Sequence, residues 1–374
     1  MVSSSNTNTP AAPEQSSTRD GFPTPPGGPT VSCIISNYNY EAYVAQAIES
    51  ALAQTVPFER IIVVDDGSTD GSRALLRKFG DRIELIETPN QGQTGACLAG
   101  FFRQPGSEYV YFLDADDYLP GYFVERVQSH LQARPVKLQF QLSTVSEQLK
   151  AFEALFPTYP TRYGSREMVR DNEIIGYYRS PPTSGNVVRA DALAGLDLAL
   201  LDKRAAIDGT LNLIMPYLGE VVSVNEPLAF RRVHTSNLGQ WSRPTVELLG
   251  KEIAVFHKSW EEAKQLLAWD STHFDGQKPL YVVEREMMIA ALQGRVPWPS
   301  FQFARTVLRT AQPVGQRLML AGWAMLLLLP HRPWQAYLVA ARRSPHNRSR
   351  GLEAVVRTVL APGRNLGLGR HKPR

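Results

Sequence analysis

The sequence predicts an α/β fold in which a doubly wound, mostly parallel sheet is flanked by helices and followed by a C-terminal helical extension. Three observations lead to this fold class. Four short apolar runs begin about 22 to 30 residues apart, as expected for strands buried on both faces. Helical patterns separate these runs. After Trp241 the apolar residues again recur at helical spacing.

The predicted strands are residues 31–36, 60–65, 82–87 and 109–114. Between the first two, one helix face with i, i+4, i+7, i+8 spacing is formed by Val44, Ile48, Ala51 and Leu52. Right-handed crossovers in such strand–helix–strand units place all four strands in one parallel sheet.

The second half of the chain gives a weaker pattern. Two further strands are expected at 137–144 and 221–224. A later helix is predicted to bury Leu249, Ile253, Phe256 and Trp260.

Composition and motifs exclude several classes of protein. With 374 residues and 43% hydrophobic residues, the chain is able to build a sizeable core. Two cysteines, Cys33 and Cys97, are too few for a disulfide framework or a four-cysteine zinc site. The sequence lacks the Gly-x-Gly-x-x-Gly fingerprint and a phosphate loop ending in Gly-Lys-Ser/Thr. A nicotinamide dehydrogenase and an ordinary ATPase are therefore not expected.

Polar residues gather where three predicted strands end, in segments 36–39, 65–70 and 114–117. Ligands of doubly wound sheets bind at this carboxyl edge. Asp114, Asp116 and Asp117 repel one another unless a cation or hydrogen bonds offset their charge, and hard divalent ions prefer such oxygen ligands. The alternative is a solvated turn closed by Pro120.

The order of these segments resembles the inverting glycosyltransferases of family two, which have the GT-A fold. The matching segments are Ser36-Asn37-Tyr38-Asn39, Ser50-Ala51-Leu52-Ala53-Gln54-Thr55, the strand running into Asp65-Asp66-Gly67-Ser68-Thr69-Asp70, the turn Asn90-Gln91-Gly92-Gln93, and Leu113-Asp114-Ala115-Asp116-Asp117. Weaker matches follow at Pro182-Thr183-Ser184-Gly185-Asn186 and in Glu226-Pro227-Leu228 with Arg232-Val233-His234-Thr235-Ser236-Asn237.

The resemblance implies a domain organisation. Residues 30–240 would form the GT-A domain, with a nucleotide-sugar half at 30–135 and an acceptor half at 136–240. A disordered segment is expected at 1–29, a helical extension at 241–330 and a basic tail at 331–374.

The resemblance also implies roles for individual residues. Ser36, Tyr38 and Asp66 would hold the base and ribose of a nucleotide-diphosphate sugar, and a carboxylate at Asp66 can accept the ring N–H of uracil or thymine. Asp114 would serve the ribose side, and with Asp116 would bind Mg²⁺ or Mn²⁺ against the diphosphate.

Two residues of the closing segment are further candidates. Arg232 would bind the diphosphate, although the preceding position, usually aromatic in the family, is Arg231 here. His234 would bind the metal or the diphosphate, and its alternative is a purely structural histidine.

The general base implied by the family is an Asp or Glu in the second half of the domain. Asp208 is the candidate, although Ile207 stands where the family usually has a Glu before it. A helix N-cap is the alternative role of Asp208, and Asp202 is the alternative base.

The predicted function is transfer of a sugar to a hydroxyl of a glycan or lipid-linked acceptor during cell-surface polysaccharide synthesis, on the cytoplasmic side of the membrane. A catalytically inactive nucleotide-sugar-binding protein and a nucleotidyltransferase are the alternatives.

The C-terminal end of the sequence suggests a membrane partner. Residues 331–374 contain ten Lys or Arg and one acid, and the apolar run Leu318–Leu329 precedes them. Because this run is too short to span a bilayer, it is expected either in the core or, with Trp323 and Trp334, in a membrane interface. An anionic membrane surface is the expected partner of the tail, ahead of nucleic acid, and the alternative is a tail that is merely solvated.

Overall fold

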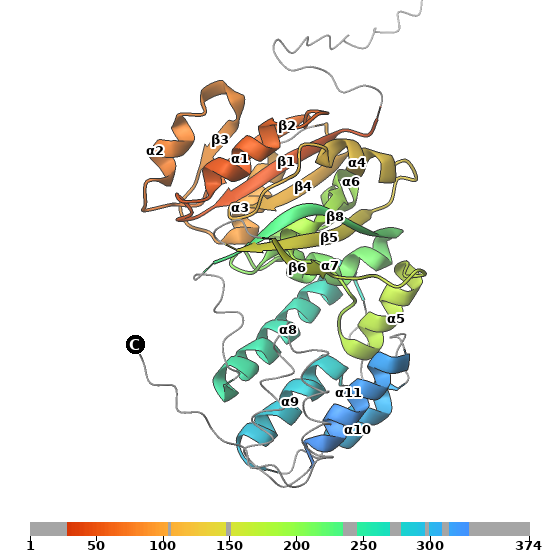
Figure 1. The fold of residues 1–374 in the computed structure, drawn as a ribbon. Helices are drawn as coiled ribbons and strands as arrows, with labels where there is room; N and C mark the ends of the chain where they lie inside the picture. Colours follow the sequence, from red (N-terminus) through yellow and green to blue (C-terminus); the bar gives the residue numbers. More distant parts are fainter. Residues whose placement is uncertain are drawn as a thin grey trace, which may run out of the picture.

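The computed structural model of the chain describes residues 28–103, 106–146, 151–234, 245–269, 278–295, 299–308 and 314–328 (Figure 1). The predicted disordered N-terminal segment, apart from Gly28 and Pro29, and the basic tail lie outside the described residues. The predicted domain boundaries stay predictions.

One eight-stranded sheet forms the centre of the domain. Its strands are β1 (Val31–Asn37), β2 (Arg60–Asp65), β3 (Glu84–Glu87), β4 (Tyr109–Asp114), β5 (Lys137–Ser146), β6 (Ala151–Phe156), β7 (Asn186–Arg189) and β8 (Val221–Val233). Strands β3, β2, β1 and β4 are neighbours in that order and parallel, as predicted. Strand β7 pairs antiparallel with both β4 and β5, and β8 runs parallel to β5. The mostly parallel sheet is confirmed.

Helices cover both faces of this sheet (Figure 1). The helices are α1 (Val44–Leu52), α2 (Ser72–Arg77), α3 (Gln93–Phe102), α4 (Phe123–His130), α5 (Ser165–Ile175), α6 (Ala190–Ala194), α7 (Ile207–Leu218), α8 (Val246–Leu266), α9 (Leu280–Leu292), α10 (Pro299–Val307) and α11 (Val314–Leu326). Side chains of α1 and α4 pack against side chains of β1 and β4 in one core cluster. Side chains of α3 and α7 share a second cluster on the opposite face. The near-continuous apolar strands follow from this two-sided burial.

The structure corrects several predicted boundaries. The third strand begins at Glu84 because residues 80–82 form a 3-10 turn. Strand β8 continues past 224 to Val233, and Pro227, which lacks a backbone N–H, lies where its register with β5 shifts. The sequence pattern predicts neither β6 nor β7. Strand β7 has only four residues, which is too short for a clear pattern.

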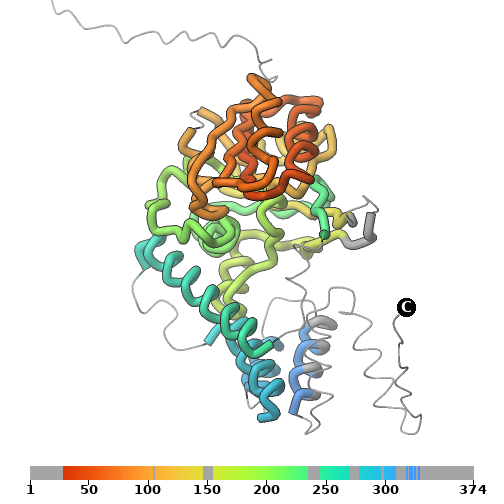
Figure 2. Tube along the Cα trace, turned by 90° about the vertical axis from the view of Figure 1, so that its left-hand side faces the viewer, coloured from red at the N-terminus to blue at the C-terminus, as the bar shows by residue number. Residues whose placement is uncertain are grey.

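Helices α8 to α11 lie below the sheet (Figure 2). Their buried side chains form a separate apolar cluster. Helix α8 connects the two regions, because Leu249 belongs to this cluster and Trp260 to the core against the sheet. In α11, Leu320 and Ala324 are buried, whereas Leu318 and Met325 are exposed. Among the described residues no helix has both the length and the apolar character to cross a membrane.

We expect Gly100 of α3 to be required for the close packing of this helix on β1. A Cβ at this position would lie 2.5 Å from Cγ2 of Ile34, so Gly100→Ala forces the helix or the strand to shift. The free energy of unfolding should fall by about 1–3 kcal/mol in urea titrations.

Gly250→Ala is the matched control, because Gly250 also lies inside a helix and a Cβ there meets no atom within 4 Å. This variant should gain about 0.5–1 kcal/mol from the lower chain entropy of alanine. Equal stability of the two variants would contradict the packing explanation.

Candidate active site

An acidic turn follows β4 at the carboxyl edge of the sheet. The backbone N–H of Asp117 donates to the carbonyl of Asp114 over 3.0 Å, which folds the three carboxylates back on one another. Asp114, Asp116 and Asp117 each offer a carboxylate oxygen, and these atoms lie within 4.8 Å of one another. We call these three residues the acidic cluster.

Strand β8 fixes this turn from the side. The backbone N–H of Arg232 donates to Asp117 Oδ1 (2.9 Å), and its Nε donates to the carbonyl of Asp116 (2.9 Å). The guanidinium also donates to Gln46 and lies over the Tyr43 ring. Because Arg232 is 3% exposed and these contacts are internal, binding a diphosphate would require it to change partners.

His234 contacts the acidic cluster through Asp116. Its Nε2 is 2.9 Å from Oδ2 of Asp116, and its ring stacks on Tyr43 at a centroid distance of 4.8 Å. With 1% exposure, the side chain orients Asp116. Its predicted contact with a metal or diphosphate stays a prediction.

Asp66 holds the turn that follows β3. Its Oδ1 accepts from the N–H of Gln91 (2.8 Å) and the hydroxyl of Thr88 (3.1 Å), and its Oδ2 accepts from the N–H of Gly92 (2.7 Å). A carboxylate has about four lone-pair sites, so one remains for a ligand N–H. Gly92 has φ +96°, and a Cβ there would lie 2.5 Å from Cα of Arg204, so glycine is required.

The same turn reaches β4, since Gln93 Nε2 donates to Asp114 Oδ1 over 2.5 Å. Ser36 of β1 lies opposite Asp114 in the strand register. Tyr38, just beyond β1, is 44% exposed. The residues predicted to hold the nucleotide therefore lie at the ends of β1, β2 and β4, at one edge of the sheet.

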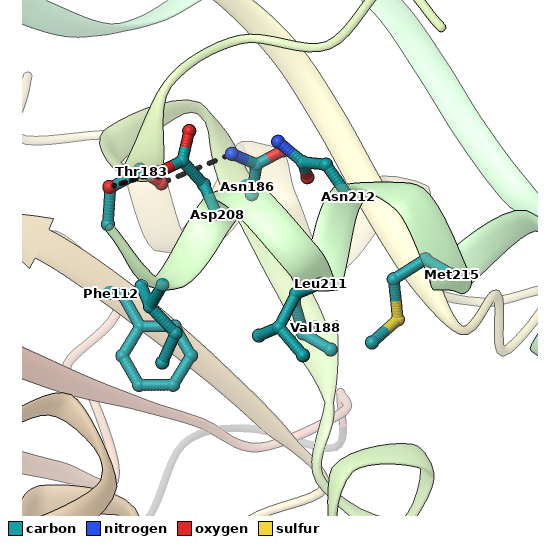
Figure 3. A pocket seen from close by; sticks show the side chains of 9 residues that line it. Phe112, Thr183, Asn186, Val188, Asp208, Leu211, Asn212 and Met215 are labelled. Atoms are coloured by element: carbon teal, nitrogen blue, oxygen red, sulfur yellow. Dashed lines mark hydrogen bonds between the residues drawn. The ribbon is translucent and has the colours of Figure 1, made fainter. Parts of the chain in front are cut away.

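Asp208 lies in the first turn of α7 and lines a small pocket (Figure 3). It is close enough to the acidic cluster for its charge to act on Asp114. The polar side chains of this pocket gather at one end, and Phe112, Val188 and Leu211 line the other. Thr183 Oγ1 donates to Asp208 Oδ1 over 3.2 Å. The N-cap of α7 is Ala206, so the alternative N-cap role of Asp208 is wrong.

The 3-10 turn Thr183–Gly185 joins the two acidic regions. While Thr183 binds Asp208, the hydroxyl of the next residue, Ser184, accepts the backbone N–H of Asp114 (3.2 Å). The Tyr111 hydroxyl donates to the carbonyl of Ser184 (2.9 Å), which ties the turn to β4. Asp208 and the acidic cluster are thus held by adjacent residues of one short turn.

Burial and mutual repulsion shift the pKa values of three acidic groups of the site. Burial, together with the charges of Asp117, Asp116 and Asp208, raises the pKa of Asp114 well above its usual range. Burial and Asp116 raise the pKa of Asp117 to about 7. Burial also raises the pKa of Asp208, against the hydrogen bond from Thr183. A cation near these carboxylates would offset their repulsion.

Asp202, the alternative base, has a different environment. Lys258 of α8 donates to its Oδ2 over 2.5 Å, and the N–H of Arg204 donates to its Oδ1. The ion pair with Lys258 lowers the pKa of Asp202. This carboxylate is paired on the outside of the domain, whereas Asp208 lies in the pocket.

Four contributors to the site were not assigned from the sequence. Asp117 belongs to the acidic cluster, and its position in the run of acids was a signal for it. Gln93 binds Asp114, and the charge of Arg231 lowers the pKa of Asp114, Asp117 and Asp208. No sequence pattern indicated Lys137, which is completely buried and donates to Asn212, a residue that lines the same pocket as Asp208.

The acidic cluster fits a hard divalent cation. Its donors are carboxylate oxygens, which Mg²⁺ and Mn²⁺ prefer, and Mg²⁺ commonly completes its coordination with water and substrate phosphates. Asp114 and Asp116 are the predicted ligands, and the geometry adds Asp117 to them.

Comparison with known proteins identifies the family of this domain. A family model described as glycosyl transferase family 2 matches residues 32–179. An uncharacterized glycosyltransferase of Nostoc sp. is 34% identical over 216 residues, which cover 55% of this chain and 66% of the relative. A poly(ribitol-phosphate) beta-glucosyltransferase of Bacillus spizizenii is 35% identical over 95 residues, covering 24% of this chain and 15% of that protein. The chain thus spans less than two thirds of the length of these relatives.

Among solved structures, the chain is similar in fold to TarS 1–349 of S. aureus, crystallised in complex with UDP-GlcNAc. The TM-score is 0.49 at 15% identity, and the alignment covers 84% of this chain and 91% of that one.

Loss of one carboxylate should weaken metal binding at the acidic cluster. In Mn²⁺ titrations followed by calorimetry, Asp116→Asn should lower the affinity by at least about tenfold, because an amide replaces an anionic ligand. Asp202→Asn removes the same charge outside the cluster and should bind as the unmodified protein does. Equal affinities in both variants would show that Mn²⁺ does not bind at Asp116.

Proposed function

Because residues 32–179 belong to glycosyltransferase family 2, we propose that the protein is a metal-dependent inverting transferase that moves a sugar from a nucleotide-diphosphate donor to a hydroxyl. Its α/β sheet is the GT-A fold of that family. The proposal is carried by one observation: adjacent residues Thr183 and Ser184 hold Asp208 beside the acidic cluster. The proposed acceptor is a glycan or lipid-linked molecule in cell-surface polysaccharide synthesis.

The donor is proposed to be of uridine or thymidine type. Asp66 has one acceptor site left for the ring N–H of such a base, and its three internal hydrogen bonds keep the carboxylate oriented. Ser36 and the exposed ring of Tyr38 lie at the adjoining strand end, where the base and ribose would bind.

Asp114, Asp116 and Asp117 would hold Mg²⁺ or Mn²⁺. Such a cation, when bound, neutralises charge that develops on the diphosphate leaving group. The protein's own contribution is to orient the ligands: Gln93 binds Asp114, His234 binds Asp116, and Arg232 binds Asp117.

Asp208 would accept the proton of the attacking acceptor hydroxyl. A general base works best when its pKa approaches the working pH, and burial moves the pKa of Asp208 in that direction. Thr183 donates to Oδ1 and thereby orients the carboxylate, which leaves Oδ2 available for the acceptor.

The alternatives make different predictions in a turnover assay. A nucleotidyltransferase would release pyrophosphate from a nucleoside triphosphate as it joins the nucleotide to a sugar phosphate, and an inactive sugar-binding protein would bind the donor without consuming it. Transfer would release a nucleoside diphosphate and place the sugar on an acceptor.

Asp208→Asn should abolish transfer while leaving the donor bound. The amide cannot take the proton, and this loss appears only in the transition state, so kcat should fall by at least about 100-fold with donor Kd nearly unchanged. The measurement is nucleoside diphosphate release from a panel of nucleotide sugars with Mn²⁺, with binding followed by calorimetry. EDTA should stop the reaction.

Asp202→Asn serves as the matched control and should keep its kcat. Loss of kcat in this variant with an active Asp208→Asn would transfer the base role to Asp202. Donor binding without turnover by the unmodified protein, across donors and acceptors, would favour the inactive binding protein.

We also propose that the protein acts at the cytoplasmic face of a membrane as a peripheral protein. Helix α10 exposes Phe301, the turn directly after it exposes Leu308, and α11 exposes Leu318 and Met325. We call these four residues the apolar face. Ten basic residues follow at 331–374, and each near an anionic leaflet adds about 1 kcal/mol of binding. Apolar contact and charge together suit an anionic lipid surface.

Liposome sedimentation tests this attachment. The full chain should pellet with vesicles containing anionic lipid at low salt and be partly released at high salt. Leu318→Glu with Met325→Glu should lower the bound fraction, because two acids then enter the apolar face. Val255→Glu places an acid on another exposed apolar position, in α8, and should not. Equal pelleting of all variants would contradict a role of this face.

A further inference from the structure

Lys137, the first residue of β5, has no exposed surface. Its Nζ donates to the Tyr178 hydroxyl (2.9 Å), the Ser180 hydroxyl (2.9 Å) and Oδ1 of Asn212 (2.5 Å). These three acceptors use the three N–H bonds of an ammonium group, and none carries a formal charge. A buried ammonium requires a compensating anion elsewhere in its surroundings.

The contact with Asn212 leads to the proposed base. Asn212 lies one helical turn after Asp208 in α7, so both side chains face the same pocket (Figure 3). Asn212 Nδ2 also donates to the carbonyl of Pro181 (3.4 Å), in the segment leading to Thr183. Lys137 thus binds Asn212, and Asn212 in turn links helix α7 to the segment before the turn that holds Asp208.

Charge links the same two residues. Burial lowers the pKa of Lys137 well below its usual value, and the negative charge of Asp208 acts against this shift. The positive charge of Lys137 in turn lowers the pKa of Asp208. The other ionisable groups around Asp208 are Arg231 on β8, Asp114 at the end of β4 and the Cys97 thiol on α3.

We propose that Lys137 is a positioning residue for Asp208: its buried ammonium keeps that carboxylate ionised and, through Asn212, holds it toward the acceptor. This inference rests on the proposed role of Asp208 as the general base. During transfer the acceptor proton passes to Asp208, and Lys137 keeps its own protons. The ammonium therefore acts through its charge and its hydrogen bonds.

The pH dependence of kcat/KM distinguishes this role from simple packing. Lys137→Met keeps the length of the side chain and removes the charge, which favours the protonated form of Asp208. Because only the ionised form accepts a proton, the acidic limb of the profile should move to higher pH. A shift of about one pH unit corresponds to a tenfold loss below the limb, recovered as the pH rises.

Tyr178→Phe is the matched control. It removes one hydrogen bond to the same Nζ and keeps both the ammonium and the ring, which lies 5.2 Å from it. Its profile should keep the position of the unmodified enzyme. An unshifted profile in Lys137→Met, or an equal shift in both variants, would overturn the proposal.

A second measurement is independent of turnover and of the folding of Lys137→Met. Thermodynamic linkage is reciprocal, so Asp208→Asn must make the Lys137 ammonium easier to deprotonate. Titration of ¹³Cε-labelled lysines by NMR should show the Lys137 signal moving to lower pH in Asp208→Asn. An identical titration in both proteins would overturn the proposal, whereas an inactive enzyme that shows this shift would count only against the proposed function.

Discussion

Repulsion among buried carboxylates is the constraint on which the active-site edge depends. Asp114, Asp116, Asp117 and Asp208 gather near the end of β4, and burial raises the pKa of Asp114, Asp117 and Asp208. Each carboxylate therefore has a hydrogen-bond donor or a cation from another element beside it. These contacts fix the relative positions of loops that are distant in the sequence. The donors are Gln93, Thr183, Arg232 and His234.

The position of β7 follows from the same arrangement. This short strand lies between β4 and β5 and directly follows the turn Thr183–Gly185, so pairing with β4 sets the turn beside the acidic cluster. A hydroxyl on each of two adjacent residues then serves the two sides of the site. The proposed donor side and the proposed acceptor side are joined through a single strand, which gives the transferase proposal its geometric basis.

Two charged side chains near the site have roles that their chemistry alone would not reveal. Arg232 is predicted from the family resemblance to bind the diphosphate, and within the protein its side chain contacts a backbone carbonyl, Gln46 and aromatic rings. Lysine is usually a surface residue, yet Lys137 is completely buried. In both cases the surroundings, rather than the residue type, decide whether the charge meets a substrate or supports another side chain.

The sequence by itself determined the parallel half of the sheet, the helix with Val44 and Ile48 buried, and the family, because strand periodicity and the acidic motifs are local patterns. Asp66, Asp114 and Asp116 lie at the predicted strand ends for the same reason. Only the tertiary structure decided that β7 enters the sheet, that Ala206 caps α7, and that Lys137 is buried and bonded to Asn212. These features depend on contacts between residues that are distant in the sequence, such as Lys137 with Asn212, 75 positions apart, which no local pattern encodes.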